Sequence, residues 1–332
     1  MRGRLTSLQQ IMIITGLTGA FLVNYVLAQV AGSSTSMLWG HPAWRWMFWM
    51  QVIPAGIFLV SLFTLPESPR FLVVKGRDAE AESVLTRLFG AAAASSTVHD
   101  IRQSLARDHH KPKFSDLIDK TTGRVRPIVW AGIGSAIFQQ LVGINVVFYY
   151  GAVLWQSVGF SENDSLKINI LSGALSIVAC LMAMGVIDKI GRKPLLLIGS
   201  AGMTATLAVV AFAFSTASQV NGAVHLSHPM GLLALISANA YVVFFNMSWG
   251  PVMWVMLGEM FPNQIRGSAL AVAGFAQWIA NFGISVSFPP MAASLGLVVT
   301  YGFYAASALL SFFFVRALVH ETRGRTLEEM EG

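Results

Sequence analysis

The chain has 332 residues, of which 55% are hydrophobic and only 11% are charged, and its mean hydropathy is +0.62. Soluble domains carry about 25% charged residues, so this composition excludes an ordinary soluble protein. The formal net charge of +6 fits a membrane topology and contact with anionic lipid, and it does not point to nucleic acid as a partner.

Apolar runs long enough to cross a bilayer recur along the whole chain. A transmembrane helix needs roughly 20 apolar residues, and its backbone polar groups must be satisfied internally, so such runs predict helices. The period-2 alternation of an outer-membrane barrel is absent from the sequence. Eight runs occur, at about 8–31, 44–65, 127–155, 167–187, 194–217, 229–258, 266–288 and 294–318. We therefore expect an all-α integral membrane protein with eight transmembrane helices.

The basic residues predict how these helices are oriented. With the first seven residues in the cytoplasm and eight spans, only Arg45 and Lys167 of the 22 Lys and Arg fall on the far side. Lysine and arginine are retained in the cytoplasm during insertion, so this asymmetry supports an even number of spans. We expect a multi-pass protein of the cell membrane (inner or plasma membrane) with both termini in the cytoplasm. The single cysteine, Cys180, lies within a span and excludes an intrachain disulfide.

One long polar stretch, residues 66–126, separates the second and third spans. Within it, the apolar residues at 84, 85, 88 and 89 recur with the spacing of an amphipathic helix. We interpret the stretch as a cytoplasmic loop with short amphipathic helices at the membrane face, in preference to a solvated linker. Six spans follow it over residues 127–318, and residues 319–332 form a cytoplasmic tail.

The third span contains an unusual concentration of amides. Residues 138–151 read FQQLVGINVVFYYG, and Gln139, Gln140 and Asn145 spread over about 240° of an ideal helix at about 100° per residue. One packed seam would not satisfy all three amides. Gly143 lies between them and allows the helix to unwind, as in transporters whose broken helices turn polar groups towards a cavity. We therefore expect these amides to contact a ligand.

A second polar and aromatic set occurs near the end of the chain. Gln277 and Asn281 are four residues apart and share one helical face, with Trp278 beside them. In the segment SWGPVMW, a proline bends the helix ahead of Trp254, for which core packing is the alternative role. Amides that donate and accept, together with aromatic faces, suit a neutral polyhydroxylated ligand such as a sugar. An anionic ligand would call for buried Arg or Lys, which the middles of the spans lack.

Ionic residues gather at the predicted inner ends of the spans. They lie in the segments PESPR, GVIDKIGRK, GEMFPNQIRG and HETRG, and they are Glu67, Arg70, Asp188, Arg192, Glu259, Arg266, Glu321 and Arg323. An isolated surface pair contributes only about 0–1 kcal/mol. Their repetition at matching helix ends indicates a latch that forms in one conformation and breaks in another. Orientation by positive charge alone is the alternative.

Other polar residues point to no chemistry. Single amides in other spans, such as Asn239 and Asn246, are interpreted as hydrogen-bonding glue between helices. The sequence shows no nucleophile–base arrangement, no metal-ligand spacing and no phosphate loop. We therefore expect neither an enzyme nor a bound metal or cofactor.

Several of these segments together resemble the sugar porter family of the major facilitator superfamily: PESPR, QQLVGIN, DKIGRK, GPVMWVMLGEMFPNQIRG and HETRGRTLEE. Their order and spacing match along essentially the whole chain. Bacterial proton-linked monosaccharide symporters of the xylose and hexose type look most similar. The resemblance implies a helical bundle of two six-helix halves around a central site that opens to alternate sides. It also implies monosaccharide transport, with proton symport in the complete protein.

The resemblance further implies which residues bind the sugar. Gln10 in the first span resembles a hydroxyl-binding amide of the family, and Trp254 resembles the tryptophan of its GP-x-x-W segment. The other implied substrate-binding residues are Gln139, Gln140, Asn145, Gln277 and Trp278. Six of the ionic residues look like the family's inner-face network, which favours the outward-open state. They are Glu67, Arg70, Asp188, Arg192, Glu259 and Arg266.

The chain departs from the family pattern in places. Ser176 stands where some glucose carriers have asparagine, and Leu17 stands where xylose symporters have glutamine, so the sugar is not identified. Family members have twelve spans, and the start of this chain resembles the loop before the fifth. We therefore expect eight of the usual twelve helices, with residues 1–65 as the last two of the N-terminal bundle and 127–318 as the C-terminal bundle. The expected partner is a missing N-terminal four-helix segment.

Three functions remain open at this point. The first is a monosaccharide carrier that cotransports protons when complete, with the sugar, protons and the lipid bilayer as its partners. The second is a sugar uniporter, because the family's coupling residues lie in the absent helices. The third is a truncated, non-transporting fragment or a membrane sugar sensor. A long signalling tail would favour the sensor, and only residues 319–332 follow the last predicted span.

Overall fold

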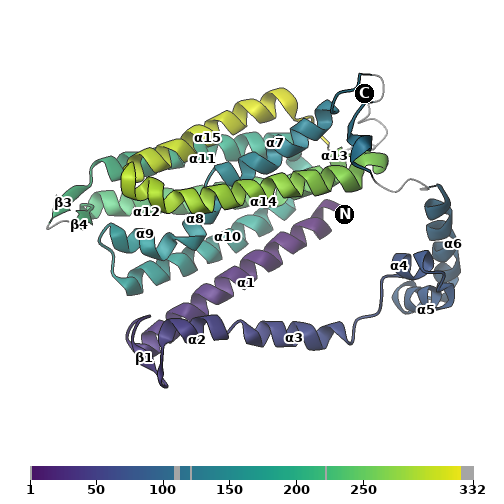
Figure 1. Ribbon diagram of the computed structural model, residues 1–332, viewed down its shortest axis with the longest axis horizontal. Helices are drawn as coiled ribbons and strands as arrows, with labels where there is room; N and C mark the ends of the chain where they lie inside the picture. The colour runs from purple at the N-terminus through teal and green to yellow at the C-terminus, as the bar shows by residue number, and fades with distance from the viewer. Residues whose placement is uncertain (1, 108–112, 120–121, 221–222, 323–332) are drawn as a thin grey trace. The chain divides into compact units, whose positions relative to one another are not determined.

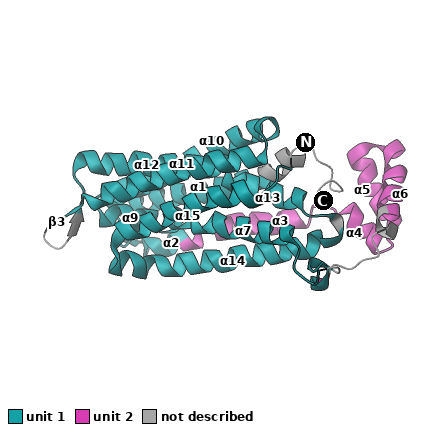
Figure 2. Cartoon of the chain, turned by 90° about the horizontal axis from the view of Figure 1, so that it is seen from above, with its two compact units in different colours: residues 1–47, 114–332 teal, residues 48–113 magenta. Residues whose placement is uncertain are grey.

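The computed structural model describes residues 2–107, 113–119, 122–220 and 223–322 (Figure 1). Within these ranges, eight helices are long and apolar enough to cross a membrane, which confirms the predicted number of spans. They run over Leu8–Ala31, Ala43–Leu62, Pro127–Tyr149, Glu162–Ile190, Arg192–Ser215, His228–Met260, Gln264–Ser294 and Gly296–Leu318. The chain divides into two compact units, residues 1–47 with 114–332 and residues 48–113, coloured teal and magenta in Figure 2.

The larger unit consists mainly of long antiparallel helices. Its helices are α1 (Arg2–Ala31), α7 (Pro127–Leu141), α8 (Ile144–Tyr149), α9 (Gly151–Ser157), α10 (Glu162–Ile190), α11 (Arg192–Ser215), α12 (His228–Met247), α13 (Trp249–Met260), α14 (Asn263–Ser294) and α15 (Gly296–Leu318). Two short antiparallel hairpins join spans, β1 (Met37–Leu38) with β2 (His41–Pro42), and β3 (Ser218–Val220) with β4 (Ala223–His225). The 3-10 turn η1 (Phe114–Leu117) precedes α7, and α2 (Ala43–Trp49) crosses the boundary between the units.

Close packing around α11 depends on small residues. The helix packs most extensively against α15 and α12, and the Ser248 side chain occupies the space where Gly199 has no Cβ. Next to it, the fully buried Trp249 donates its indole N–H to Ser200 Oγ (3.0 Å) and to the Leu196 carbonyl (3.2 Å). In a membrane, small residues let helix backbones approach so that van der Waals contact holds them together. The core of the unit is therefore set by this close approach.

A polar seam of buried side chains connects α10 to α12. Ser172 donates to Asn239 Oδ1 (2.8 Å), Asn246 Nδ2 donates to Ser176 Oγ (3.1 Å), and the Cys180 thiol donates to the Asn246 carbonyl (3.4 Å). Each asparagine also donates to the carbonyl four residues earlier in its own helix, at 2.9 Å in both cases. These amides serve as glue between the two helices, as predicted.

The smaller unit contains α3 (Val52–Leu62), α4 (Pro69–Val74), α5 (Asp78–Phe89) and α6 (Ala91–Arg107). Its core is formed by Leu72, Val73 and Ala81 together with the partly buried Val84, Val98 and Ile101. Part of the predicted amphipathic stripe therefore packs α5 against α4 and α6. Leu88 and Phe89, in the same stripe, are 63% and 67% exposed.

We expect Gly199→Ala to lower the midpoint of thermal unfolding of the detergent-solubilised protein, because the new methyl group overlaps the Ser248 side chain. Overpacking of this kind costs about 1–3 kcal/mol. Gly185, inside α10, has open space around its Cβ position, so Gly185→Ala is the matched control and leaves the midpoint unchanged or higher. Equal midpoints for the two variants would show that α11 and α12 do not approach as closely as described.

Candidate functional site

The third span breaks at Gly143, as predicted. Gly143 has a φ of +82°, in the left-handed region, and separates α7 from α8. The break leaves the Val142 carbonyl without its helical partner, and the buried Tyr241 hydroxyl donates to it at 2.8 Å. A Cβ on Gly143 would lie 2.7 Å from the Tyr304 ring, so only glycine fits both the backbone angle and the space.

Gln139, which is 3% exposed, is the centre of a buried amide network at this break. Its Nε2 donates to the Trp249 carbonyl at 3.1 Å. Its Oε1 accepts from Gln277 Nε2 at 2.6 Å and from Gln140 Nε2 at 3.3 Å. A single amide therefore joins α7 to the start of α13 and to α14.

The network continues from α7 through α8 to α14. Asn145 Nδ2 donates to Gln140 Oε1 at 2.6 Å and to Asn281 Oδ1 at 2.7 Å. Ser285 donates to the same Asn281 oxygen at 3.3 Å, and the Tyr150 hydroxyl donates to the Ser285 carbonyl at 3.0 Å. The amides of two distant sequence segments thus form one continuous chain of hydrogen bonds.

The sequence argument that one seam would not satisfy Gln139, Gln140 and Asn145 was wrong. That argument placed the three amides on one ideal helix, where they point in different directions. The break at Gly143 ends α7 before Asn145 and starts a new helix, so the angular spacing no longer applies. As a result, all three amides belong to one network.

A second break, at Ser248 between α12 and α13, lies beside the network. Ser248 has φ −130° and ψ −88°, and Pro251 in the first turn of α13 has no N–H to donate. Gln139 Nε2 lies 3.5 Å from the Gly250 carbonyl at this break. The Gln10 amide nitrogen, from α1, lies 3.6 Å from the Cβ position of Gly250. The structure therefore brings Gln10 close to Gln139 across one glycine.

The two tryptophans predicted to bind substrate lie on α13 and α14, two helices that the amide network joins, but they are not part of the network. Trp254 on α13 is 40% exposed, and Trp278 on α14 is 66% exposed. In the part of the chain that the structure describes, neither indole N–H donates to a network amide. Both rings keep a free face for contact with another molecule.

Two buried polar atoms near Gly143 have no hydrogen-bond partner among the described residues: Gln277 Oε1 and the Tyr304 hydroxyl. Gln277 is 7% exposed and Tyr304 is 1% exposed. Sequence reasoning missed Tyr304, as well as Tyr241, which satisfies the break. A tyrosine inside a membrane span was the available signal, because its hydroxyl requires a partner there.

The charge cluster predicted for the inner ends of the spans is centred on Arg192, whose side chain is 7% exposed. Its Nε and Nη2 bind both oxygens of Glu259, at 3.0 and 2.9 Å, and Nη2 lies 3.1 Å from Asp188 Oδ1. Thr322 donates to Glu259 Oε2 at 2.8 Å. A bidentate pair of this kind is geometrically specific, and a guanidinium this deeply buried is strongly destabilised when its partner is removed.

Glu321 joins this cluster through the backbone. Its two carboxylate oxygens accept the N–H groups of Arg192 and Lys193, each at 3.0 Å, at the positive end of α11. Gly191, with φ +103°, allows this approach, because its Cβ position lies only 2.7 Å from Glu321 Oε2. The C-terminal segment is thereby held against the connection between α10 and α11.

The other four predicted ionic residues are Arg266 on α14, Glu67, Arg70 and Arg323. Arg266 donates from Nε to the Phe261 carbonyl at 3.2 Å. Glu67 and Arg70 belong to the smaller unit, and Arg323 lies outside the described residues. Asp188, Arg192, Glu259 and Glu321 are thus joined in one cluster, as predicted for neighbouring helix ends.

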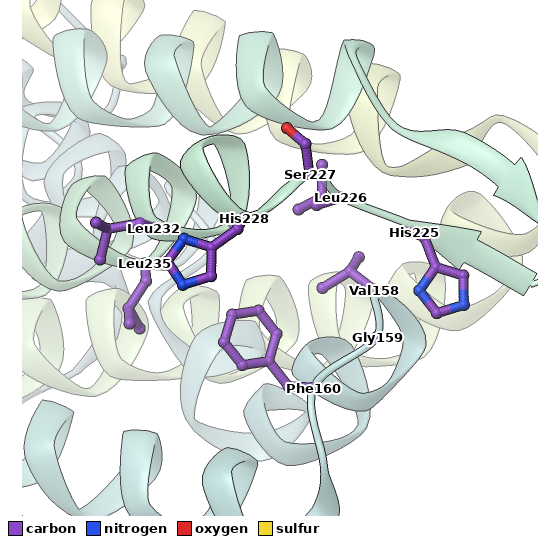
Figure 3. Close-up of a pocket in the computed structure, with 10 residues that line it drawn as sticks. Val158, Gly159, Phe160, His225, Leu226, Ser227, His228, Leu232 and Leu235 are labelled. Atoms are coloured by element: carbon purple, nitrogen blue, oxygen red, sulfur yellow. The ribbon is translucent and has the colours of Figure 1, made fainter.

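A separate hollow of about 290 Å³ opens between the α9–α10 connection and the start of α12. Figure 3 shows His225 and His228 on opposite sides of it, with Phe160 below and Leu232 beside His228. None of the predicted binding residues lines it. Within the described residues, no group of three or more His, Cys, Asp or Glu is arranged to hold a metal ion.

Comparisons with known proteins agree on one family. The sequence model described as "Sugar (and other) transporter" matches residues 1–332. The chain is 49% identical over 332 residues to the glucose transport protein of Synechocystis, an alignment that covers 99% of this chain and 70% of that protein. It is 38% identical over 337 residues to the D-xylose-proton symporter of Escherichia coli K12, covering 99% of this chain and 64% of the symporter.

Solved structures of the xylose transporter XylE have the same fold. The proton:xylose symporter bound to 6-bromo-6-deoxy-D-glucose has a TM-score of 0.75 at 37% identity, covering 99% of this chain and 66% of that one. A partially occluded inward-open conformation has a TM-score of 0.79 at 37% identity, covering 98% of this chain and 65% of that one. The present chain thus spans about two thirds of the length of these proteins.

We expect Gly143→Ala to lower the unfolding midpoint, because alanine is strained at φ +82° and its methyl group meets the Tyr304 ring. The left-handed conformation alone costs roughly 1–2 kcal/mol. Gly274 in α14 has helical neighbours and open space, so Gly274→Ala is the control and should retain the parent midpoint. If both variants melt at the parent temperature, the third span is continuous and the site described above does not exist.

Proposed function

This chain belongs to the family of sugar transporters, and from that membership we propose that it carries the sugar-binding site of a membrane protein that moves a monosaccharide by alternating access. The fold is that of the major facilitator superfamily, and the chain is a multi-pass membrane protein. The observation that supports the proposed substrate most directly is the amide network around Gly143. Its amides come from α7, α8 and α14 and bind the backbone of α13, and they lie beside two breaks in the helices.

The network differs from the amides that only hold helices together. Asn239 and Asn246 each donate to a carbonyl of their own helix; Asn239 also accepts from Ser172 of α10, and Asn246 donates to Ser176 of α10. Their hydrogen bonds therefore stay within one packed seam. The network amides instead bind one another, and within the described part of the chain Gln277 Oε1 has no hydrogen-bond partner. An unsatisfied buried acceptor costs about 1–3 kcal/mol, which a hydroxyl donor would recover.

The chemistry of the network fits a neutral sugar. Each amide donates and accepts, so sugar hydroxyls can replace amide–amide hydrogen bonds one for one. The described network contains no Arg, Lys, Asp or Glu, which is unsuitable for an anionic substrate. Trp254 and Trp278 offer apolar faces for the C–H face of a sugar ring, and Gln10 adds a further amide from α1.

We assign proton symport to the complete carrier, in line with the relative named as a D-xylose-proton symporter. Because the described network contains no Asp, Glu or His, the coupling proton binds elsewhere in the carrier. Residues 1–65 then supply the last two helices of the N-terminal bundle, and residues 127–318 form the C-terminal bundle. A four-helix segment accounts for the remaining length of the relatives and completes the first bundle. Residues 66–126 form the cytoplasmic loop, and both termini lie in the cytoplasm of the cell.

The charge cluster of Arg192 fits the role of an inner gate. Its residues come from the two ends of the α10–α11 connection, from α13 and from the segment after α15, so movement of any one of these elements breaks ionic contacts. We assign Arg266, Glu67, Arg70 and Arg323 to the same gate in the complete carrier.

Gln140→Ala and Asn145→Ala should each weaken the binding of radiolabelled D-xylose and D-glucose to the purified protein at least tenfold. Each change removes an amide that can bind a sugar hydroxyl, and the Asn145 change also leaves Gln140 Oε1 without its donor. A lost hydrogen bond costs about 0.5–1.5 kcal/mol, and an unsatisfied buried acceptor costs about 1–3 kcal/mol. Gln156 on α9 is exposed and outside the network, so Gln156→Ala is the control and keeps parent binding. Parent-like binding by both network variants, or no binding of either sugar to the parent, would reject the proposed site.

Glu259→Gln should weaken the inner gate without changing sugar affinity, because Arg192 loses its charged bidentate partner far from the amides. We expect a membrane-impermeant thiol reagent on the inner side to label a cysteine at the exposed position 264 several-fold faster. His320 is exposed and precedes Glu321 in the sequence, so His320→Ala is the control. In this variant the cysteine at position 264 should be labelled at the parent rate. A loss of sugar affinity with unchanged labelling would contradict the gating role.

A further inference from the structure

Two hydrogen bonds join α1 to α10 at the end of the bundle opposite the charge cluster. Gln29 Nε2, near the end of α1, donates to Asn163 Oδ1 at 2.5 Å. The backbone N–H of Ser34, just after α1, donates to Glu162 Oε1 at 2.9 Å. Because α10 runs from Glu162 to Ile190, these contacts and the Arg192 cluster lie at opposite ends of the same 29-residue helix. We call Gln29, Ser34, Glu162 and Asn163 the outer clasp.

Both halves of the clasp are held in place by local structure. On α10, Ser161 caps the helix by accepting the Asp164 N–H at 3.1 Å, which places Glu162 and Asn163 in the first turn. On the other side, the Ser34 carbonyl accepts the Trp44 N–H at 2.9 Å. This backbone contact ties the bend after α1 to the start of α2. The clasp therefore joins two preorganised turns.

The rest of the α1–α10 interface is different in character. At mid-helix, Thr18 occupies the space where Gly173 has no Cβ, so the two helices cross there in close contact. Further along, Ile11 and Ile14 pack against Cys180 in an apolar cluster. Across these apolar contacts α1 can rotate on α10 without breaking hydrogen bonds, which are directional. At the clasp, the same rotation breaks the two hydrogen bonds.

We propose that the outer clasp is the outer gate of the transport pathway. It is closed in this structure, and it must open when α1 rotates about the crossing at Gly173 to expose the amide network to the outside. This inference rests on the proposed transport function. The clasp suits the role because solvent-accessible hydrogen bonds are individually weak, so they can break and re-form within a transport cycle.

The test is a distance measurement between spin labels in nanodiscs, without sugar. Cysteines at the exposed positions 30 on α1 and 171 on α10 carry the labels, in a Cys180→Ser background that keeps a donor to Asn246. In Gln29→Ala/Glu162→Ala we expect an added population with distances longer by about 5 Å or more, the size of a one-turn shift between helices. The parent keeps a single shorter population.

The controls separate a gate from a general loss of structure. Lys167 lies in the same helix, is exposed and pairs with Asp164, so Lys167→Ala should match the parent. Gln29 is exposed, so Gln29→Ala alone preserves the fold and gives a smaller shift of the same kind. Parent-like distances in both clasp variants, or an equal shift in Lys167→Ala, would overturn the proposal that the outer clasp is a gate. Because no sugar is present, failed sugar binding with a clear shift would reject the proposed function and leave the clasp standing.

Discussion

The structure depends on one constraint: a backbone group that leaves a helix inside a membrane must find a partner in the protein. The break at Gly143 releases the Val142 carbonyl, and the buried Tyr241 hydroxyl satisfies it. At the second break, Gln139 binds the backbone of Trp249 at the start of α13. The same amide then reaches Gln277 and Gln140, so the satisfaction of the broken helices and the assembly of the candidate site are one arrangement.

The two ends of α10 use different chemistry. One end is held by the buried guanidinium of Arg192 between two carboxylates, with Glu321 fixed to the backbone of α11. The other end is held by the exposed Gln29–Asn163 hydrogen bond and the partly buried bond from the Ser34 N–H to Glu162. Between them, α1 and α10 meet through small and apolar residues, with Gln10 close to the amide network. A helix that is fixed by hydrogen bonds at its two ends and packs through small and apolar side chains in between is suited to a rigid-body rotation.

Particular residues show how far sequence reasoning reached. The span count, the break at Gly143 and the glue role of Asn239 were predicted correctly, because each follows from local composition or backbone sterics. The angular argument for Asn145 failed, because it assumed the helix that Gly143 interrupts. Tyr304 was missed, since nothing local shows that its ring lies against a glycine far away in the sequence.

The sequence by itself determined the class of protein, the number of its spans and which side chains have the chemistry to bind hydroxyls, because hydropathy and side-chain chemistry are properties of short segments. Only the tertiary structure decided which of those residues meet. Gln139 and Gln277 lie 138 positions apart, and Gln29 and Asn163 lie 134 apart. Their pairing is set by how closely the helices pack and where they break, and that depends on contacts among all the helices at once.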